Sequence, residues 1–136
     1  MRYLLDTNTV SHLMRANPLA LAHLGALGGS RVFISAITEA EMRYGLAKNP
    51  AATGLRRAVE ELWARIGVLD FTAATAKAYG TLRAHLEASG MPMSPLDTLI
   101  AATALEQNGN PAGMVLVTND HAFSRVAGLV VEDWTR

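Results

Sequence analysis

Residues 2–9, at the start of the chain, read Arg2-Tyr3-Leu4-Leu5-Asp6-Thr7-Asn8-Thr9. The first four form a short apolar run, which is typical of a buried strand, and the last four are residue types that cap helices. We therefore expect a strand over residues 2–5, a turn at Asp6 and a helix that follows it. This stretch decides the fold because the rest of the chain repeats its alternation.

Further apolar runs predict four more strands, over residues 32–35, 67–71, 114–118 and 129–131. Helices are expected over residues 36–47, 55–66, 73–88 and 94–107, with a short one over 121–125. Strands that alternate with helices predict an α/β fold of three layers, α/β/α, around a mostly parallel central sheet of about five strands.

Acidic residues stand where a fold of this kind binds its ligands, outside the carboxyl ends of the strands. Asp6 follows the first predicted strand, and Asp120 follows the fourth. Asp97 belongs to the first turn of a helix that Ser94 opens as N-cap, with Pro95 at the first helical position. These positions make the three acids candidate site residues.

Length and composition are those of a single domain. A chain of 136 residues, half of them hydrophobic, can bury one core, so residues 1–136 are expected to form one domain. The chain has no cysteine, which excludes disulfides and a thiolate metal site. Its start turns acidic too early for a secretory signal, and no apolar run approaches the roughly 20 residues of a membrane span. We expect a soluble, cytoplasmic protein.

The charges balance, with twelve Lys and Arg against twelve Asp and Glu. A strongly basic nucleic-acid-binding protein would not show this balance. The chain carries four acids that could be metal ligands, namely Asp6, Glu41, Asp97 and Asp120. If metal neutralised them, twelve basic residues would face eight acidic ones, and ten of the twelve are Arg, whose planar side chain suits phosphate. The composition therefore permits RNA binding.

Glu41 differs from its neighbour Glu39 in the direction that the helix period gives it. Glu39 stands four residues before Arg43, which favours a solvated ion pair of about 0.3 to 0.5 kcal/mol. Glu41 shares a face with Ile37 and Tyr44, so its carboxylate is expected to turn toward the apolar side of the helix. Burying an unpaired charge is costly, so we expect a cation or a dedicated hydrogen-bond partner beside Glu41.

Asp97 and Asp120 each have a structural and a functional interpretation. Asp97 could complete a capping box with Ser94, and Asp120 could cap the short helix after it. Together with Asp6 and Glu41, however, they form a set of four carboxylates that could converge at the edge of the sheet. Clustered like charges repel unless a cation neutralises them, and all-oxygen ligands select hard ions. The set therefore predicts a site for Mg²⁺ or Mn²⁺.

Other kinds of site have little support in the sequence. The four histidines have no paired spacing that suits zinc; they are His12, His23, His85 and His121. There is no Gly-x-Ser-x-Gly elbow, and the glycine-rich residues 25–30 lack the lysine of a P-loop. An aspartyl phosphatase that starts from Asp6 would have a second Asp two residues later, where the chain has Asn8.

At these residues the sequence resembles the PIN-domain family, and within it the VapC-type toxins, over essentially its whole length. The matching stretches are residues 4–8 (LLDTN), 34–41 (ISAITEAE) with Tyr44 and Gly45, 95–102 (PLDTLIAA), 117–120 (VTND) with Phe123, 125–129 (RVAGL) and 132–134 (EDW). Their order along the chain makes the set specific. The chain departs from many relatives in having Asp120 where they have Asn, and in having Ala122 where an acid precedes the Phe.

The resemblance implies a metal site and an activity. It assigns both metal binding and catalysis to Asp6, Glu41, Asp97 and Asp120, with Asn8 and Thr118 as polar support. The implied activity is that of an Mg²⁺- or Mn²⁺-dependent endoribonuclease, which hydrolyses phosphodiester bonds and leaves a 3′-hydroxyl and a 5′-phosphate. VapC-type relatives cut tRNA, in some cases initiator tRNA in the anticodon stem-loop.

The resemblance also implies partners. These are a VapB-like antitoxin that blocks the acidic site, a second copy of the chain in a homodimer, and operator DNA bound only through the antitoxin. The helical surface around Val10, Leu13 and Met14 could receive the antitoxin segment, although ordinary core packing also accounts for these residues.

Two other functions remain open at this point. The chain could be a non-catalytic PIN-like subunit that binds an antitoxin and modulates its affinity for operator DNA. It could also be a metal-dependent phosphatase or a structure-specific DNA nuclease. Comparison of RNA, DNA and phosphomonoester substrates would separate these functions.

Overall fold

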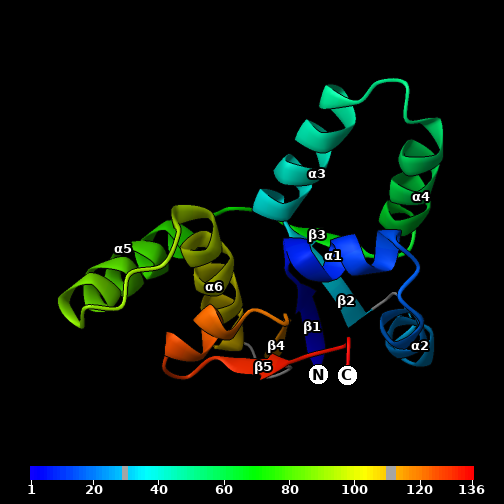
Figure 1. The fold of residues 1–136 in the computed structure, drawn as a ribbon. Helices are drawn as coiled ribbons and strands as arrows, with labels where there is room; N and C mark the ends of the chain where they lie inside the picture. Colours follow the sequence, from blue (N-terminus) through cyan, green and yellow to red (C-terminus); the bar gives the residue numbers. More distant parts are fainter. Residues whose placement is uncertain (29–30, 110–112) are drawn as a thin grey trace.

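The computed structural model describes residues 1–28, 31–109 and 113–136. Its centre is one sheet of five parallel strands in the order β3-β2-β1-β4-β5. The strands are β1 (Arg2–Leu5), β2 (Val32–Ser35), β3 (Gly67–Leu69), β4 (Met114–Val117) and β5 (Val130–Glu132). β1 lies in the middle, so the opening stretch of the sequence is also the centre of the sheet (Figure 1).

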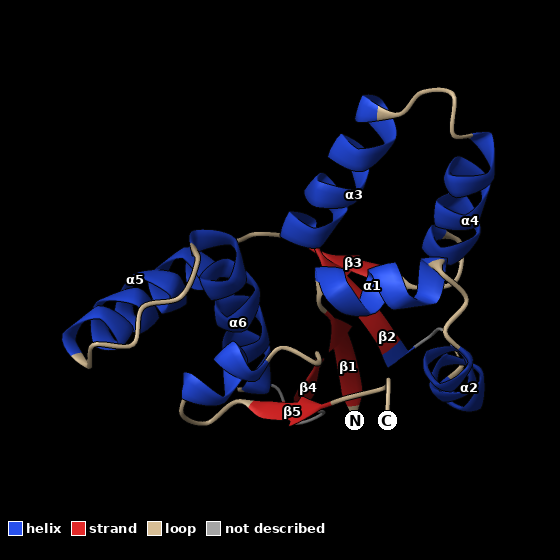
Figure 2. Ribbon diagram, viewed as in Figure 1, coloured by secondary structure: helices blue, strands red, loops and turns tan. Residues whose placement is uncertain are grey.

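The helices cover both faces of this sheet. They are α1 (Thr7–Met14), α2 (Pro18–Leu27), α3 (Ala36–Lys48), α4 (Thr53–Trp63), α5 (Ala73–Ala88), α6 (Pro95–Asn108) and the 3₁₀ helix η2 (His121–Arg125). In Figure 2, α5 and α6 lie on one side of the strands, and α1, α2 and α4 lie on the other. The three-layer prediction is therefore confirmed. No helix in the described residues is both long and apolar enough to cross a membrane.

Two neighbouring residues of β1 anchor the two halves of the core. Leu4 packs in the cluster under α5 and α6, and Leu5 packs in the cluster under α1 and α2. Both are fully buried. Because successive side chains of a strand point to opposite faces, a central strand covered on both sides needs apolar residues at every position. This requirement explains why the run shows no alternation of polar and apolar residues.

The strands follow the sequence-based prediction closely. β1 and β2 have the predicted bounds, as does α5 among the helices. The third strand is shorter than expected, because it ends at Leu69 and leaves Asp70 and Phe71 exposed. The sheet is parallel throughout rather than mostly parallel.

Two helices differ from the prediction. The helix expected over residues 55–66 begins at Thr53 and ends at Trp63, and Ile66 is buried in the connection to β3. The other difference is α2, for which the sequence predicted no element.

Helix α2 was missed because its residues are apolar on all sides and so show no helical period. Ala20 and Leu24 are buried, whereas Leu19 on the same helix is half exposed. Its start was nevertheless readable from the chain. The Asn17 side chain accepts a hydrogen bond of 3.0 Å from the backbone NH of Ala20, and Pro18 occupies the first turn.

The carboxyl ends of β1 and β4 place two polar residues side by side. Leu5 pairs with Val117 in the sheet, so Asp6 and Thr118, which follow them, are neighbours. The backbone NH of Asp6 donates to the carbonyl oxygen of Val117 at 3.1 Å. The candidate site therefore begins at the centre of the sheet, as expected for a parallel α/β fold.

Candidate active site

Asp6 lies at the junction of β1 and α1 and is only 3% exposed. It is the N-cap of α1: Oδ1 accepts a hydrogen bond of 2.8 Å from the backbone NH of Thr9, and Oδ2 accepts one from the hydroxyl of Thr118. Burial raises the pKa of Asp6, these hydrogen bonds oppose the rise, and the negative charge of Asp97 adds to it. No ion pair between described residues includes Asp6. Its carboxylate is thus buried without a counter-ion there.

Thr118 connects two of the predicted acids. It follows β4 and is 2% exposed. Its hydroxyl donates to Oδ2 of Asp6 and accepts a hydrogen bond of 3.0 Å from the backbone NH of Asp120. One hydroxyl therefore orients the carboxylate of Asp6 and the loop that carries Asp120.

Replacing Thr118 with valine will destabilise the fold. Valine keeps the shape of the side chain but leaves Oδ2 of Asp6 and the Asp120 backbone NH each without its hydrogen bond to Thr118. The expected loss in the free energy of unfolding is about 2 kcal/mol, measured by chemical denaturation. Thr118→Ser keeps the hydroxyl and is expected to lose clearly less. Equal losses in the two variants would mean that the methyl group matters and the hydrogen bonds do not.

Asp97 lies in the first turn of α6 and is half-buried. As predicted, Ser94 is the N-cap, and its Oγ accepts a hydrogen bond of 3.2 Å from the backbone NH of Asp97. Burial raises the pKa of Asp97, the Ser94 side chain opposes the rise, and the negative charge of Asp120 adds to it. Since Asp97 also raises the pKa of Asp6, the three aspartates are linked through their charges.

Glu41 is half-buried on α3 and has the dedicated partner that the sequence led us to expect. The hydroxyl of Thr7 donates to its Oε1 at 2.7 Å. The Thr7 oxygen also lies 3.4 Å from the hydroxyl oxygen of Thr38. The neighbouring Glu39 forms the predicted ion pair with Arg43, with 2.9 Å between Oε2 and Nε. The two glutamates therefore differ as the helix period indicates.

Thr7 is a site residue that the sequence analysis did not single out. It is the first residue of α1 and directly follows Asp6. Its bond to Glu41 ties the start of α1 to α3, across 34 positions of the chain. A hydroxyl residue beside an acid at a strand-to-helix junction was the only local signal, and capping alone accounted for it.

Asp120 and Asn8 are both more exposed than Asp6. Asp120 is the N-cap of η2, and its Oδ1 accepts a hydrogen bond of 2.9 Å from the backbone NH of Ala122. This geometry matches the capping interpretation of Asp120, while the second carboxylate oxygen is outside that bond. Asn8 is exposed in the first turn of α1.

The charges of the aspartates affect one another, but the described acids do not form a preformed metal site. Within the described ranges, no three Asp, Glu or His side chains are placed to hold one ion together. Mg²⁺ commonly takes one or two carboxylates and keeps several waters. Asp6 is buried and Asp97 is half-buried, and the negative charge of Asp97 raises the pKa of Asp6, so the two carboxylates fit a hydrated divalent cation of this kind.

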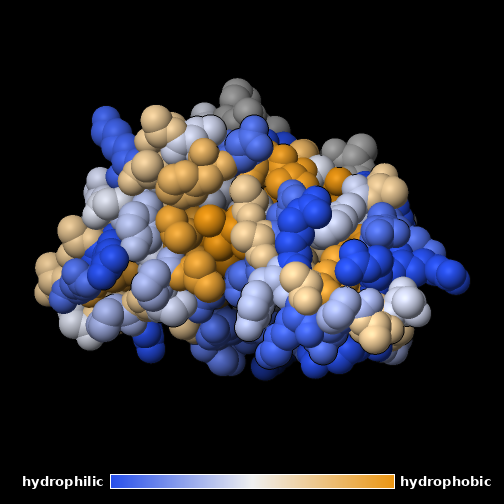
Figure 3. Space-filling model, turned by 90° about the horizontal axis from the view of Figure 1, so that it is seen from above, coloured by the Kyte–Doolittle hydropathy of each residue, from blue (hydrophilic) through white to orange (hydrophobic). Residues whose placement is uncertain are grey.

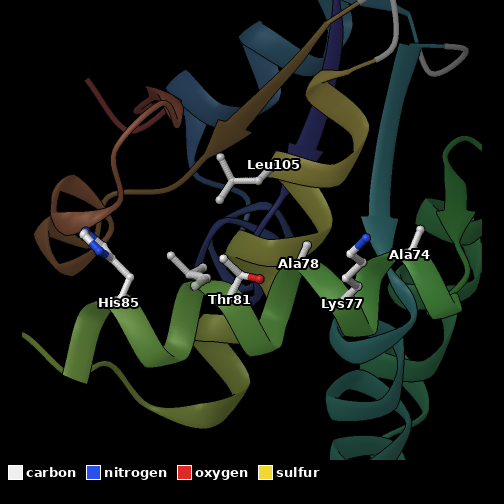
Figure 4. Close-up of a pocket in the computed structure, with 7 residues that line it drawn as sticks. Ala74, Lys77, Ala78, Thr81, His85 and Leu105 are labelled. Carbon is white, nitrogen blue, oxygen red and sulfur yellow. The ribbon is translucent and has the colours of Figure 1, made fainter. Parts of the chain in front are cut away.

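The four acids lie outside the hollow between α5 and α6. A cavity of about 480 Å³ lies between α5 and α6 and contains none of the four acids. Its lining includes Lys77, His85 and Leu105 (Figure 4). A groove of about 290 Å³ between α1, α3 and α4 contains Glu41, and a pocket of about 180 Å³ contains Thr118 and Asp120. Glu41 and Asp120 thus line separate hollows, and neither hollow is lined by Asp6 or Asp97.

Comparison with protein families identifies the class of protein. The model of the PIN domain matches residues 3–129. This match covers β1 to the turn before β5, including all four acids. The chain belongs to the PIN-domain family, and the predicted resemblance is confirmed.

Curated relatives place the chain within that family. It is 33% identical to a protein of Shigella flexneri named tRNA(fMet)-specific endonuclease VapC, over 99% of both chains. It is 35% identical to the protein of the same name from Salmonella typhimurium, over 98% of both chains. A solved structure of VapBC2 from Rickettsia felis, bound to a DNA fragment from its promoter, superposes with a TM-score of 0.87 at 31% identity, covering 98% of this chain and 99% of that one. Among PIN domains, the chain is of the VapC type.

Proposed function

We propose that this chain is a divalent-metal-dependent endoribonuclease and the toxin of a toxin–antitoxin pair. The observation that carries the proposal is the state of Asp6. Its carboxylate is buried at the ligand-binding edge of the sheet, has no counter-ion among the described residues, and is burdened further by the charge of Asp97. Such an arrangement is stable with a cation bound and is poorly explained by packing alone.

We assign metal binding to Asp6 and Asp97, with Glu41 and Asp120 acting on the water around the ion. When bound, the metal would lower the pKa of water and stabilise negative charge on the transition state. Hydrolysis adds water across one P–O bond, so one proton leaves the nucleophile and one reaches the departing 3′ oxygen. Glu41 and Asp120 are the carboxylates available to hold such protons.

The hydroxyl residues of the site would keep these acids in place. Thr7 holds Glu41, and Thr118 holds Asp6 together with the Asp120 backbone. Because each threonine contacts a different acid, the carboxylates are oriented by separate elements. The site would then need no rearrangement of its backbone when substrate binds.

We propose tRNA as the substrate, and initiator tRNA in its anticodon stem-loop as the first candidate. Two relatives that match nearly the whole chain are named tRNA(fMet)-specific endonuclease, and this name supports the proposal. Cleavage would leave a 3′-hydroxyl and a 5′-phosphate.

We also propose a VapB-like antitoxin as partner, a homodimer, and contact with operator DNA only through the antitoxin. Solved relatives that are VapBC complexes, two of them bound to DNA, support the antitoxin and the DNA contact, and the homodimer is proposed from the family resemblance. The groove that contains Glu41 also contains Val10 and Met14, so an antitoxin segment lying there would cover that acid. Val10 and Leu13 are both buried in the core and Met14 packs against it, as the alternative interpretation of these residues held.

The decisive experiment incubates purified protein with tRNA transcripts, single-stranded DNA and p-nitrophenyl phosphate. We expect cleavage of RNA with Mg²⁺ or Mn²⁺, none with EDTA, and recovery when Mg²⁺ is restored. Sequencing of the RNA ends would give the cut position. RNA cleavage that persists in EDTA would contradict the metal role. Absence of RNA cleavage with either metal would favour the non-catalytic subunit, and turnover of the DNA or the phosphomonoester alone would favour the other enzymes.

A further inference from the structure

Tyr44 has an exposure that neither the core nor the acid site explains. The sequence places it on the apolar face of its helix, together with Glu41, yet its side chain is 66% exposed. It is the most exposed of the large hydrophobic residues that the structure describes. This aromatic ring is exposed to water one helical turn from a candidate catalytic acid, so a ligand of the site could cover it.

Helix geometry shows which way the ring lies. Ile37 and Tyr44 are seven residues apart, so they share a face of α3. Ile37 packs against the cluster formed with α5 and α6, which fixes that face as the one turned toward α6. Tyr44 continues the face outward, beyond the carboxyl edge of the sheet, where α3 extends past the strands (Figure 2). Glu41 lies between the two along the helix.

The tip of the hairpin formed by α3 and α4 is basic, although the hairpin as a whole carries four acids and four cations. Residues 42–59 contain four cations and no acid: Arg43, Lys48, Arg56 and Arg57. Arg43 is paired with Glu39 and lies 4.5 Å above the ring of Trp63. The other three are exposed and belong to none of the ion pairs between described residues. Figure 3, seen from above, shows mainly hydrophilic side chains over α3 and α4, and a hydrophobic patch over α5 and α6.

Lys48 joins the ring to this charge. Its Nζ lies 5.8 Å from the centroid of the Tyr44 ring, within the range of a cation–π contact. The ring therefore combines a flat apolar surface with an adjacent positive charge. This pairing matches single-stranded nucleic acid, whose bases stack on aromatic rings while its phosphates meet cations. A partner that offered only apolar side chains would leave the adjacent charge of Lys48 without a counter-charge.

We propose that Tyr44 is a base-stacking platform and Lys48 a phosphate contact for the RNA strand as it leaves the acid site. The strand would pass from Glu41 along α3 toward the tip of the hairpin, where Arg56 and Arg57 extend the positive field. This inference rests on the proposed ribonuclease function, and it names residues that bind the substrate outside the acids. Tyr44 is thus a positioning residue.

The test compares Tyr44→Ala, Tyr44→Phe and the wild type. Affinity is measured by filter binding of a labelled tRNA transcript and of a short single-stranded RNA of mixed sequence, both in an Asp6→Asn background that leaves them uncut. Tyr44→Ala is expected to weaken binding and raise KM by about 5- to 100-fold, with kcat within about twofold. Tyr44→Phe keeps the ring and should restore both. Phe71→Ala, which removes an exposed ring from outside the hairpin, is the control and should change neither.

The two lysines of the chain provide a matched pair for the charge. Lys48→Gln is expected to reduce the slope of log Kd against log salt by about 0.7, the value for one phosphate contact on a single strand. Lys77→Gln, at the cavity between α5 and α6, should leave the slope unchanged (Figure 4).

Three results would overturn the proposal. These are an unchanged RNA affinity in Tyr44→Ala, a fall in kcat with KM unchanged, and a loss confined to binding of a protein partner. Because filter binding needs no catalysis, a protein that binds RNA through Tyr44 but never cuts it would refute the proposed activity while leaving this platform standing.

Discussion

Asp6→Asn will abolish metal-dependent RNA cleavage, with a loss in kcat/KM on the order of 10³-fold. Asparagine has the size of aspartate and can still accept the hydrogen bond from the Thr9 backbone NH, so α1 keeps its cap. It carries no charge, however, and cannot hold a divalent cation beside Asp97. Asp70→Asn, which alters an exposed aspartate after β3, is the control and should cleave normally. Cleavage by Asp6→Asn at the wild-type rate would refute the proposed site.

The same variant is expected to unfold at a higher temperature than the wild type when metal is absent. Burial and the charge of Asp97 raise the pKa of Asp6 in the folded state, so the folded protein holds that proton more tightly than the unfolded chain does. The contribution of Asp6 to the stability of the wild type is therefore fully present below the pKa of the carboxyl in the unfolded chain. It is lost as the pH rises through the pKa in the folded protein.

Thermal unfolding across pH would reveal this gain. Asn avoids the cost of ionising a buried carboxyl, so the Tm of the variant should exceed that of the wild type by a few degrees at neutral pH. The difference in Tm should disappear at acid pH. Addition of Mg²⁺ should raise the Tm of the wild type and leave that of the variant unchanged. A variant that unfolds earlier than the wild type at neutral pH would mean that the carboxylate stabilises the fold by itself.

Trp134→Ala will cost about 3 to 5 kcal/mol of unfolding free energy. The indole is 1% exposed and stacks on His23 of α2, with 5.6 Å between ring centroids and 7° between planes. The ring centroid of Tyr3, on β1, lies 5.9 Å from that of Trp134. The Nε1 of Trp134 donates a hydrogen bond of 2.9 Å to Oε1 of Glu132. One side chain thus ties the end of the chain to α2 and to the central strand.

Chemical denaturation of Trp134→Ala and Trp63→Ala would test this role. Trp63 is only partly buried, so its loss should cost clearly less. Trp134→Phe should recover part of the stability, because it refills most of the cavity but loses the bond to Glu132. Similar losses at the two tryptophans would contradict the anchoring role.

Local signals allowed most of the fold to be predicted. Asp6, Ser94 and Asp120 all cap the helices that follow them, because a cap depends on a side chain and a backbone NH within three positions. Periodicity failed at α2, where apolar residues on every side hide the helical period. It also placed Tyr44 on an apolar face although that residue is 66% exposed, because a helical period shows which residues share a face but not what packs against it.

The candidate site was predicted as a set of acids but not as an arrangement. The strand ends and helix starts indicated which residues reach the edge of the sheet. The hydroxyl partners were beyond such reasoning, because Thr118 and Asp6 are 112 positions apart. The structure shows charge effects of Asp97 on Asp6 and of Asp120 on Asp97, and a hydrogen bond from Thr7 to Glu41; the convergence of all four carboxylates on one ion stays a prediction.

The amino-acid order alone determined the alternating strands and helices, the caps and the identity of the acids, since each depends on contacts within one or two turns of backbone. The pairing of β1 with β4 decided the rest. It brings Thr118 beside Asp6 and removes water from that carboxylate, because burial is a property of what packs alongside a residue and not of the residues next to it in the chain.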